Sequence, residues 1–227
     1  MKIGILCAGN SELAPFLPMI EDCVTTEKAM LTFYEGRIDN RAIVTLYSGV
    51  CKVNAAVAAQ ILIDTYGCDA IINAGVAGGM DEQLNVFDTV ISNEIAHHDV
   101  DENILTEFHP WMDSAFFKAD NGLLEAAKKV IADSRTEHKY VIGRMVTGEQ
   151  FIKDETKDEI NARYAPLSVD METASVAQVC FVNKIPFIAV RSLTDNATHD
   201  ASDDFERNCE VASSLSADFV RAMLKYI

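Results

Sequence analysis

The stretch that decides the fold runs from Ser168 to Asp195 and reads SVDMETASVAQVCFVNKIPFIAVRSLTD. Apolar runs of strand length occupy residues 167–171 and 186–190, and from Val176 onward apolar residues recur between them at helical spacing. The pattern predicts a strand, a helix and a second strand. In such a unit the two strands lie parallel, so the expected fold class is α/β.

Each of the two predicted strands ends on charge. The first ends on Asp170 and Glu172, and the second on Arg191 and Asp195. Ligands of α/β proteins bind at the carboxyl ends of parallel strands, so these side chains are candidate site residues. The alternative is that the carboxylates only start helices, where the macrodipole and capping stabilise them. This stretch alone leaves both interpretations open.

The composition is that of a globular protein, since 49% of the 227 residues are hydrophobic and 24% are charged. The length suits one α/β domain, and the chain contains no repeat or low-complexity linker, so a single domain over residues 1–227 is expected. The formal net charge of −16 argues against nucleic acid or an anionic membrane surface as partner. The expected ligand is therefore a small molecule, neutral or cationic.

Cysteine usage and hydropathy indicate the compartment. The six cysteines are widely spaced without a C-x-x-C pair, which argues against structural zinc and favours free thiols in a reducing environment. The N-terminal run MKIGILCAGN is too short for a signal peptide, and no stretch approaches the roughly 18 uninterrupted apolar residues of a membrane span. The sequence therefore predicts a cytoplasmic protein.

Further strands and helices are expected along the rest of the chain. The predicted strands are residues 2–8, 29–34, 41–48, 69–73, 87–95 and 140–146, and the predicted helices are residues 10–21, 52–66, 119–134 and 203–226. Residues 100–117 are interpreted as a long loop that carries Phe108 and the only tryptophan, Trp111. Loops of this length are commonly functional.

Other candidate site residues also follow strand ends. Glu12 stands in the first helical turn after the first strand, and the glycines of AGVAGG, residues 74–79, allow close approach to a ligand. Phe151 in GEQFI is suited to stack on a flat ring. Packing roles for the glycines and for Phe151 remain open. The HHD run at residues 97–99 lacks the spacing of metal ligands, so no metal site is expected.

With Glu12, AGVAGG, GEQFI, VDMETASVAQVC and RSLTD in order, the chain resembles the 5′-methylthioadenosine/S-adenosylhomocysteine nucleosidases of the nucleoside phosphorylase superfamily. The resemblance covers nearly the whole length. It implies a three-layer α/β/α fold around a mixed, partly closed sheet, a homodimer, and no cofactor. It also implies a reaction in which water displaces adenine from C1′ of a 5′-substituted ribose, in methionine salvage and S-adenosylmethionine by-product recycling.

The resemblance assigns catalytic roles to three carboxylates. Asp195 looks like the general acid that protonates adenine N7, and Glu172 like the carboxylate that holds the ribose hydroxyls. Glu12 looks like the base that orients and deprotonates water. This division agrees with glycoside hydrolysis, in which one acid serves the leaving group and another carboxylate serves the water. Each such group contributes roughly a hundred- to ten-thousand-fold.

By the same resemblance, further residues contact the nucleoside or its attacking water. Phe151 would stack on adenine, and backbone groups of Ile152 would hydrogen-bond the edge of the base. Arg191 would help to fix the water and the nearby acids. The full expected set is Val76, Gly78, Phe151, Ile152, Met171, Arg191 and Phe205.

Two departures from the family pattern concern the 5′-substituent. Gly9 stands where these nucleosidases commonly carry Met, which removes apolar cover near the ribose. The loop reads VDENILTEFHPWMDSAFF in place of an F-G-Y-x-x-G-Q-like run, and in the family this loop reaches toward the 5′-substituent, partly of the neighbouring subunit. Its candidate contacts are Ile104, Leu105, Phe108 and Trp111.

Three alternatives stay open. A phosphorylase of the same superfamily would use phosphate, but the loop after the first strand carries Glu12 and no Arg, although Arg41 is available elsewhere. A hydrolase for a futalosine-type nucleoside would use the same acids. A non-catalytic purine-binding relative would keep the fold without the reaction.

Overall fold

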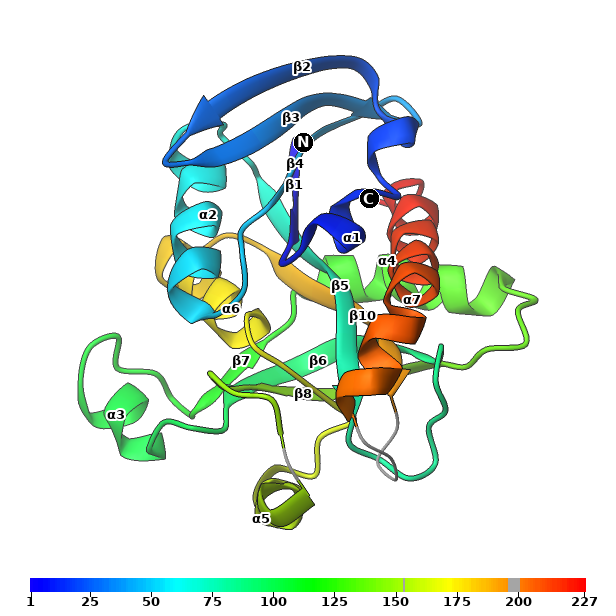
Figure 1. Ribbon diagram of the computed structural model, residues 1–227. Coiled ribbons are helices and arrows are strands. Elements are labelled where there is room, and N and C mark those ends of the chain that lie inside the picture. The colour runs from blue at the N-terminus through cyan, green and yellow to red at the C-terminus, as the bar shows by residue number, and fades with distance from the viewer. Residues whose placement is uncertain (153, 196–200) are drawn as a thin grey trace.

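A mixed sheet of ten strands forms the centre of the computed structural model (Figure 1). The structure describes residues 1–152, 154–195 and 201–227. The strands are β1 (Ile3–Cys7), β2 (Glu21–Lys28), β3 (Leu31–Ile38), β4 (Arg41–Tyr47), β5 (Ala70–Gly79), β6 (Thr89–His97), β7 (Phe116–Lys118), β8 (Tyr140–Thr147), β9 (Ser168–Asp170) and β10 (Phe187–Asp195). The helices are α1 (Asn10–Leu13), a short 3-10 helix (Leu17–Met19), α2 (Lys52–Asp64), α3 (Glu102–Glu107), α4 (Asn121–Asp133), α5 (Asp154–Tyr164), α6 (Thr173–Asn183) and α7 (Ala201–Leu224).

The length of β5 lets one part of the sheet close on itself. The strand pairs in parallel with β1 along its first residues and with β10 along most of its length, and it pairs in antiparallel with β9 at its end. From β10 the sheet continues through β6 and β8 to β9, so these four strands and β5 form a closed ring. The open remainder runs from β1 through β4 and β3 to β2.

Helices cover both faces of the sheet. Apolar residues of α2 and α6 pack into one core, and those of α1, α4 and α7 pack into a second. Figure 1 shows these two groups of helices on opposite sides of the strands. The predicted three-layer α/β/α fold with a mixed, partly closed sheet is therefore confirmed.

The prediction that the two strands of the Ser168–Asp195 stretch lie parallel is wrong. The first, β9, is parallel to β8 and antiparallel to β5, whereas β10 is parallel to β5, so β9 and β10 run in opposite directions. The reason is that β9, only three residues long, is the strand that closes the ring. Its Val169 pairs with Gly78, and Gly78 pairs with Asp195 on its other side. The charged residues at the ends of β9 and β10 therefore lie close together on either side of Gly78, although the two strands run in opposite directions.

Two boundaries near the N-terminus are also wrong. The helix predicted at residues 10–21 ends at Leu13, because Pro15 supplies no N–H group to continue it. The strand β2 was not predicted, because all its side chains are exposed and its sequence therefore lacks alternation. Ala29 and Met30, predicted as strand, form the turn between β2 and β3 with positive φ angles of 53° and 63°.

Polar and glycine-rich strand ends account for the other differences. Both β5 and β10 continue past their predicted ends and stay buried, β5 through the glycines of AGVAGG and β10 through Asp195. The predicted loop 100–117 contains α3 and the start of β7, and the polar helix α5 was not predicted. Helix α2 forms as expected, and Gly67 follows it with a φ of +63°.

Candidate active site

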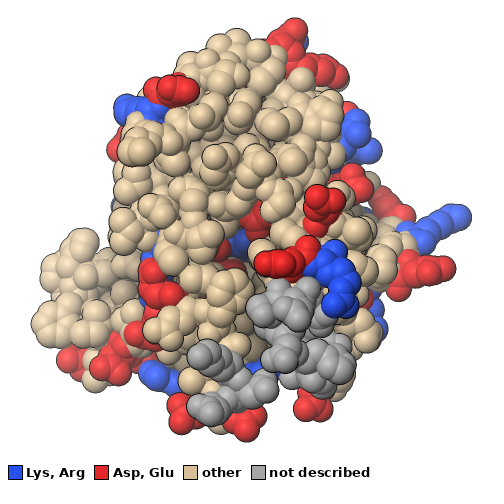
Figure 2. Space-filling model, in the orientation of Figure 1, with Lys and Arg blue, Asp and Glu red and all other residues tan. Residues whose placement is uncertain are grey.

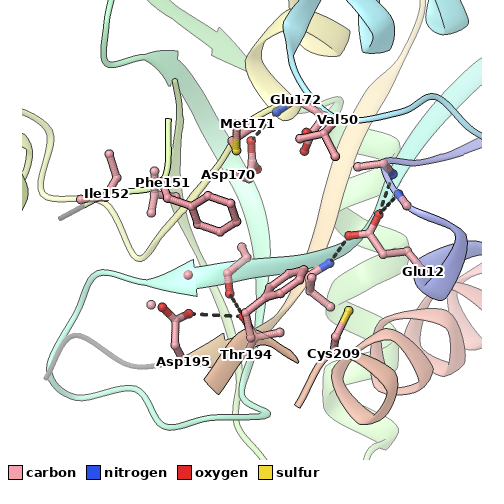
Figure 3. Close-up of a pocket in the computed structure, with 18 of the residues that line it drawn as sticks. Glu12, Val50, Phe151, Ile152, Asp170, Met171, Glu172, Thr194, Asp195 and Cys209 are labelled. Atoms are coloured by element: carbon pink, nitrogen blue, oxygen red, sulfur yellow. Dashed lines mark hydrogen bonds between the residues drawn. The ribbon is translucent and has the colours of Figure 1, made fainter. Parts of the chain in front are cut away.

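A cavity of about 660 Å³ opens where the carboxyl ends of β1, β5 and β10 meet the starts of α1, α6 and α7 (Figure 3). Nine of the ten predicted site residues line it: Glu12, Val76, Gly78, Phe151, Ile152, Met171, Glu172, Asp195 and Phe205. They come from separate parts of the sequence and meet because the ring of strands closes. On the face shown in Figure 2, which is hollowed near its centre, Lys and Arg side chains are scattered among acidic ones.

Glu12 is held at one end of the cavity by backbone N–H groups. Its Oε2 accepts hydrogen bonds from Ala8 and Gly9 at 2.6 and 2.9 Å, and its Oε1 accepts one from Val76 at 2.8 Å. The residue is 4% exposed. Helix α1 begins shortly after β1. The first turn of α1 therefore directs the Glu12 carboxylate toward the neighbouring strand β5. An acceptor with three N–H donors is held in one orientation, as a base that orients water requires.

Glu172 is the N-cap residue of α6 and lies across the cavity from Asp195. Its Oε1 accepts the N–H of Cys51 at 2.9 Å, and its Oε2 accepts from Arg191 at 3.4 Å. Burial raises the pKa of Glu172 to about 7, against the opposing effect of Arg191. The carboxyl group therefore changes charge near neutral pH.

Arg191 is fully buried in β10 and joins three carboxylates. Its guanidinium lies 3.3 Å from Glu12, 3.5 Å from Asp170 and 3.4 Å from Glu172. It also donates to Asn73 Oδ1 at 2.8 Å. Burial alone would lower the pKa of Arg191, but the three carboxylates outweigh burial and raise it. Arg191 is the one predicted site residue that does not line the cavity, because the acids stand between it and the open space.

Asp195 ends β10 on the opposite side of the cavity from Glu12 (Figure 3). Thr194 donates its hydroxyl to Asp195 Oδ1 at 3.3 Å. Gly78 faces the carboxylate closely, because a Cβ at that position would lie 3.3 Å from Oδ1. Burial raises the pKa of Asp195 to about 6. A buried carboxyl group with a raised pKa is suited to donate a proton.

Apolar side chains cover the remaining walls. The rings of Phe151 and Phe205 meet edge to face with centroids 6.1 Å apart, although Phe151 itself is 62% exposed. Phe205 and Val76 pack with Cys209 of α7. Ile152 packs against the cluster around Met80 and Tyr164. The cavity therefore combines aromatic surface at its mouth with carboxylates at its ends.

Sequence reasoning predicted Arg191 beside the acids but missed two other residues that organise them, Asp170 and Asn73. Asp170 was recognised only as a charged strand end, yet it accepts from the hydroxyl of Thr147 at 2.7 Å, from the N–H groups of Glu172 and Thr173 at 3.0 and 2.9 Å, and from the Thr173 hydroxyl. Asn73 was counted as the end of an apolar strand. The available signal was a buried polar residue in an otherwise apolar run, which requires a partner.

The HHD run forms no metal site. Among the described residues, no group of three or more His, Cys, Asp and Glu side chains is arranged to hold a metal ion. His97 shares a hydrogen bond with Gln178 at 3.1 Å, and Asp99 pairs with Lys52 at 2.5 Å. Burial lowers the pKa of both His97 and His98.

Comparison with known proteins identifies the family. The chain matches the family model described as the phosphorylase superfamily over residues 2–225. A 5′-methylthioadenosine/S-adenosylhomocysteine nucleosidase from Shewanella loihica is 38% identical over 234 residues, with 100% of each chain covered. The chain belongs to this nucleosidase family. The membership expected from the sequence motifs is thus confirmed.

Solved nucleosidases share the fold over the full chain. The enzyme from Colwellia psychrerythraea 34H, in complex with adenine, is 37% identical with a TM-score of 0.92, covering 100% of this chain and 95% of its own. The enzyme from Neisseria meningitidis, in complex with methylthio-immucillin-A, is 32% identical with a TM-score of 0.92, covering 100% and 99%. A futalosine hydrolase of Helicobacter pylori is 28% identical with a TM-score of 0.91, covering 100% and 98%.

Proposed function

We propose that this protein is an N-glycosyl hydrolase that converts 5′-methylthioadenosine, S-adenosylhomocysteine and 5′-deoxyadenosine to adenine and the 5′-substituted ribose. The observation that carries the proposal is that Glu12, Glu172 and Asp195 line one cavity and are each at most 6% exposed. Further support comes from related nucleosidases that bind adenine and methylthio-immucillin-A.

In the proposed mechanism Asp195 serves the leaving group. The bond between C1′ and adenine N9 breaks with its electron pair moving onto the base, and Asp195 gives its proton to N7. Adenine then leaves as a neutral molecule rather than as an anion. A pKa of about 6 supports this role, because the carboxyl group still carries a proton in part of the molecules near neutral pH.

Glu12 and Glu172 serve the water and the sugar. Water forms the new bond to C1′ and gives a proton to Glu12, while Glu172 accepts hydrogen bonds from the ribose hydroxyls. The negative charge of Glu172 stabilises the positive charge that develops on the ribose. Arg191, which does not line the cavity, forms ion pairs with both carboxylates and keeps them in place.

The apolar lining is assigned to the nucleoside. Phe151 stacks on adenine, backbone groups of Ile152 hydrogen-bond the edge of the base, and Phe205 covers the site from α7. Val76, Gly78 and Met171 contact the base and the ribose. Their positions in the cavity lining support these roles.

The cavity favours water over phosphate as the nucleophile. Phosphate sites require cationic and backbone donors, whereas the N–H groups of Ala8, Gly9 and Val76 are already bound to Glu12. Among the described residues, Lys157 is the only Lys or Arg in the cavity lining. Arg41 starts β4 and lies at the other end of the sheet from the Cys7 end of β1. These observations support hydrolysis over phosphorolysis.

The test is to measure adenine release from methylthioadenosine, S-adenosylhomocysteine and 5′-deoxyadenosine, each with and without phosphate. The expected result is adenine with free 5′-substituted ribose, independent of phosphate. A sugar 1-phosphate that forms only with phosphate would establish a phosphorylase. Futalosine is the fourth substrate to include, because a solved futalosine hydrolase shares the fold. Cleavage of futalosine alone would replace the proposed substrates, and binding without cleavage would indicate a non-catalytic relative.

A homodimer is part of the proposal. Exposed apolar side chains lie on the outer surface of α2 and α6, which pack side by side, and on the segment around α3. We define this apolar face as Val53, Val57, Phe181, Val182, Ile104, Phe108 and Trp111, and each is at least 44% exposed. The last three do not line the cavity of their own chain, whereas Leu105 is buried in the core. A second copy is the proposed cover for this face.

The proposal also covers the cellular compartment, the pathway and the domain organisation. We assign the enzyme to the cytoplasm and to methionine salvage with S-adenosylmethionine by-product recycling, and we treat residues 1–227 as one domain. The six cysteines form no disulfide, which supports a reducing compartment. The family match over residues 2–225 supports one domain. No helix in the described part of the chain has both the length and the apolarity to span a membrane. Accumulation of methylthioadenosine in cells that lack the enzyme would test the pathway.

A further inference from the structure

Outside the cavity, three residues from different parts of the fold, Lys52, Asp99 and Glu149, contact one another. Lys52 at the start of α2 places its Nζ 2.5 Å from Asp99 Oδ1, just after β6. Asp99 Oδ2 accepts the backbone N–H of Glu149, just after β8, at 3.1 Å. Glu149 Oε1 in turn accepts the backbone N–H of Lys52 at 3.1 Å. Each of the three residues therefore contacts the other two.

Two of the three side chains, those of Lys52 and Asp99, are partly buried, whereas Glu149 is exposed. The side chains of Lys52 and Asp99 are 15% and 30% exposed. Burial would raise the pKa of Asp99, but the hydrogen bond and the charge of Lys52, together with the N–H of Glu149, outweigh burial and lower the pKa. Asp99 is therefore ionised at neutral pH, and hydrogen bonds to a carboxylate are stronger than those between neutral groups.

The segment that follows Glu149 depends on this support. Residues 150–152 line the cavity, and Phe151 is 62% exposed, with a ring contact to Phe205. The residue before Glu149 packs against His98, since a Cβ on Gly148 would come within 2.1 Å of His98 Nε2. The aromatic ring at the mouth therefore has little packing of its own to fix its direction.

The same contacts also reach the ribose side of the cavity. The N–H of Cys51 donates to Glu172 Oε1 at 2.9 Å, and the next N–H along the chain, that of Lys52, donates to Glu149. Two consecutive backbone groups at the start of α2 thus bind one acid inside the cavity and one beside its aromatic mouth. The separation between Glu172 and the Phe151 segment is set through α2.

We propose that Lys52, Asp99 and Glu149 are positioning residues that hold residues 148–152 in the geometry that binds the nucleobase. The inference rests on the proposed function, because it takes Phe151 and Ile152 as the contacts of adenine. The three residues touch neither substrate nor reacting atoms. Their effect is on base affinity, since disordering a binding segment adds an ordering cost to each binding event.

The test compares Lys52→Met, Lys52→Arg and Asp99→Asn. Lys52→Met raises KM for methylthioadenosine and the Kd for adenine about tenfold, while kcat stays within about threefold of wild type. Asp99→Asn shifts both constants in the same direction, and it carries the test if Lys52→Met does not fold. Lys52→Arg, which keeps the charge, restores both constants. Titration calorimetry gives the adenine Kd independently of turnover.

The matched control is Lys2→Met, which removes a 2.7 Å ion pair with Glu35 at the start of β1, away from the cavity. It leaves KM and the adenine Kd unchanged. Unchanged constants in Lys52→Met, a loss of kcat alone, or an equal effect in Lys2→Met overturns the inference. If wild type releases no adenine from any nucleoside, the proposed function fails. In that case weaker adenine binding by Lys52→Met still supports the positioning role, and unaltered binding overturns it.

Discussion

Glu12 and Gly75 approach each other so closely that no side chain fits at position 75. A Cβ there would lie 2.1 Å from Glu12 Oε1, and the φ angle of Gly75 is +152°. The next residue, Val76, donates its N–H to that same oxygen at 2.8 Å. The backbone of β5 can therefore bind the carboxylate edge because residue 75 has no side chain. This glycine sets the position of the proposed catalytic base.

Gly75→Ala should abolish most turnover by displacing Glu12. The expected loss in kcat is about a hundredfold or more, the range for a misplaced general base. Steady-state kinetics measures it, and circular dichroism checks that the variant is folded. The matched control is Gly67→Ala, which strains a φ of +63° after α2 but meets no atom within 4 Å. Gly67→Ala loses some stability and keeps its kcat. Equal kinetics in both variants would contradict the role given to Gly75.

Asp195→Asn should lose about a hundredfold or more in kcat, because the amide cannot donate the proton to N7. The exposed residue Asp218 on α7 provides the control, and Asp218→Asn keeps wild-type kinetics. Near-wild-type turnover by Asp195→Asn would remove Asp195 as the acid.

The same variant should be more stable than wild type at alkaline pH. Burial raises the pKa of Asp195 from 3.8 to about 6, so its contribution to stability is complete below the unfolded value and is lost as pH rises through 6. At pH 8 the neutral amide avoids burying a charge, and Tm rises by about 2 °C or more. At pH 4 the two proteins unfold at similar temperatures. Thermal unfolding at both pH values measures the difference.

The pH dependence of kcat/KM should be bell-shaped. The proposed mechanism requires Asp195 protonated, with a pKa of about 6, and Glu172 ionised, with a pKa of about 7. The active form is therefore most populated near about pH 6.5, and kcat/KM falls about tenfold per unit well outside this range on either side. Glu172→Gln is nearly inactive at every pH. Glu94 lies outside the cavity, so Glu94→Gln retains the bell-shaped pH dependence of kcat/KM. A flat profile would exclude this pairing of acid and base.

The sequence predicts which residues meet more reliably than it predicts where strands end. Glu12, Glu172 and Asp195 were selected because each follows an apolar run and because the motifs match a family, and all three line one cavity. Both kinds of evidence are local in sequence. The prediction that each carboxylate lies near the end of a strand stays correct even when the predicted strand boundaries are wrong by several residues.

The direction of β9 and the role of Asp170 were not predictable in this way. The direction of β9 depends on ring closure between β5 and β8, which are distant in sequence. The role of Asp170 depends on partners supplied by Thr147 and by Arg191 from other elements. The exposed strand β2 lacks the alternation that identifies a strand, because neither of its faces is buried.

Val53→Glu should convert the proposed dimer to a monomer. Val53 is 73% exposed on α2 and belongs to the apolar face, where a carboxylate buried in the dimer without a partner is costly. Light scattering during size-exclusion chromatography measures the mass. The control is Val211→Glu, because Val211 is 50% exposed on α7, which packs against the opposite face of the sheet from α2. A dimer that persists in Val53→Glu, or a wild type that is monomeric, would place the interface elsewhere or remove it.

Arg191→Met should make folding depend on pH. The substitution leaves Glu12, Asp170 and Glu172 buried together without their shared cation, and breaking such a buried pair costs about 3–5 kcal/mol. Burial already raises the pKa of Glu172 against the opposing effect of Arg191, and without the guanidinium that opposition is lost, so stability is present at low pH and is lost as pH rises. We expect a folded, inactive protein near about pH 5 and an unfolded one near about pH 8. The exposed pair of Arg221 with Asp39 provides the control, because surface ion pairs contribute little and Arg221→Met leaves stability nearly unchanged at both pH values. Wild-type stability of Arg191→Met at pH 8 would show that the carboxylates need no shared cation.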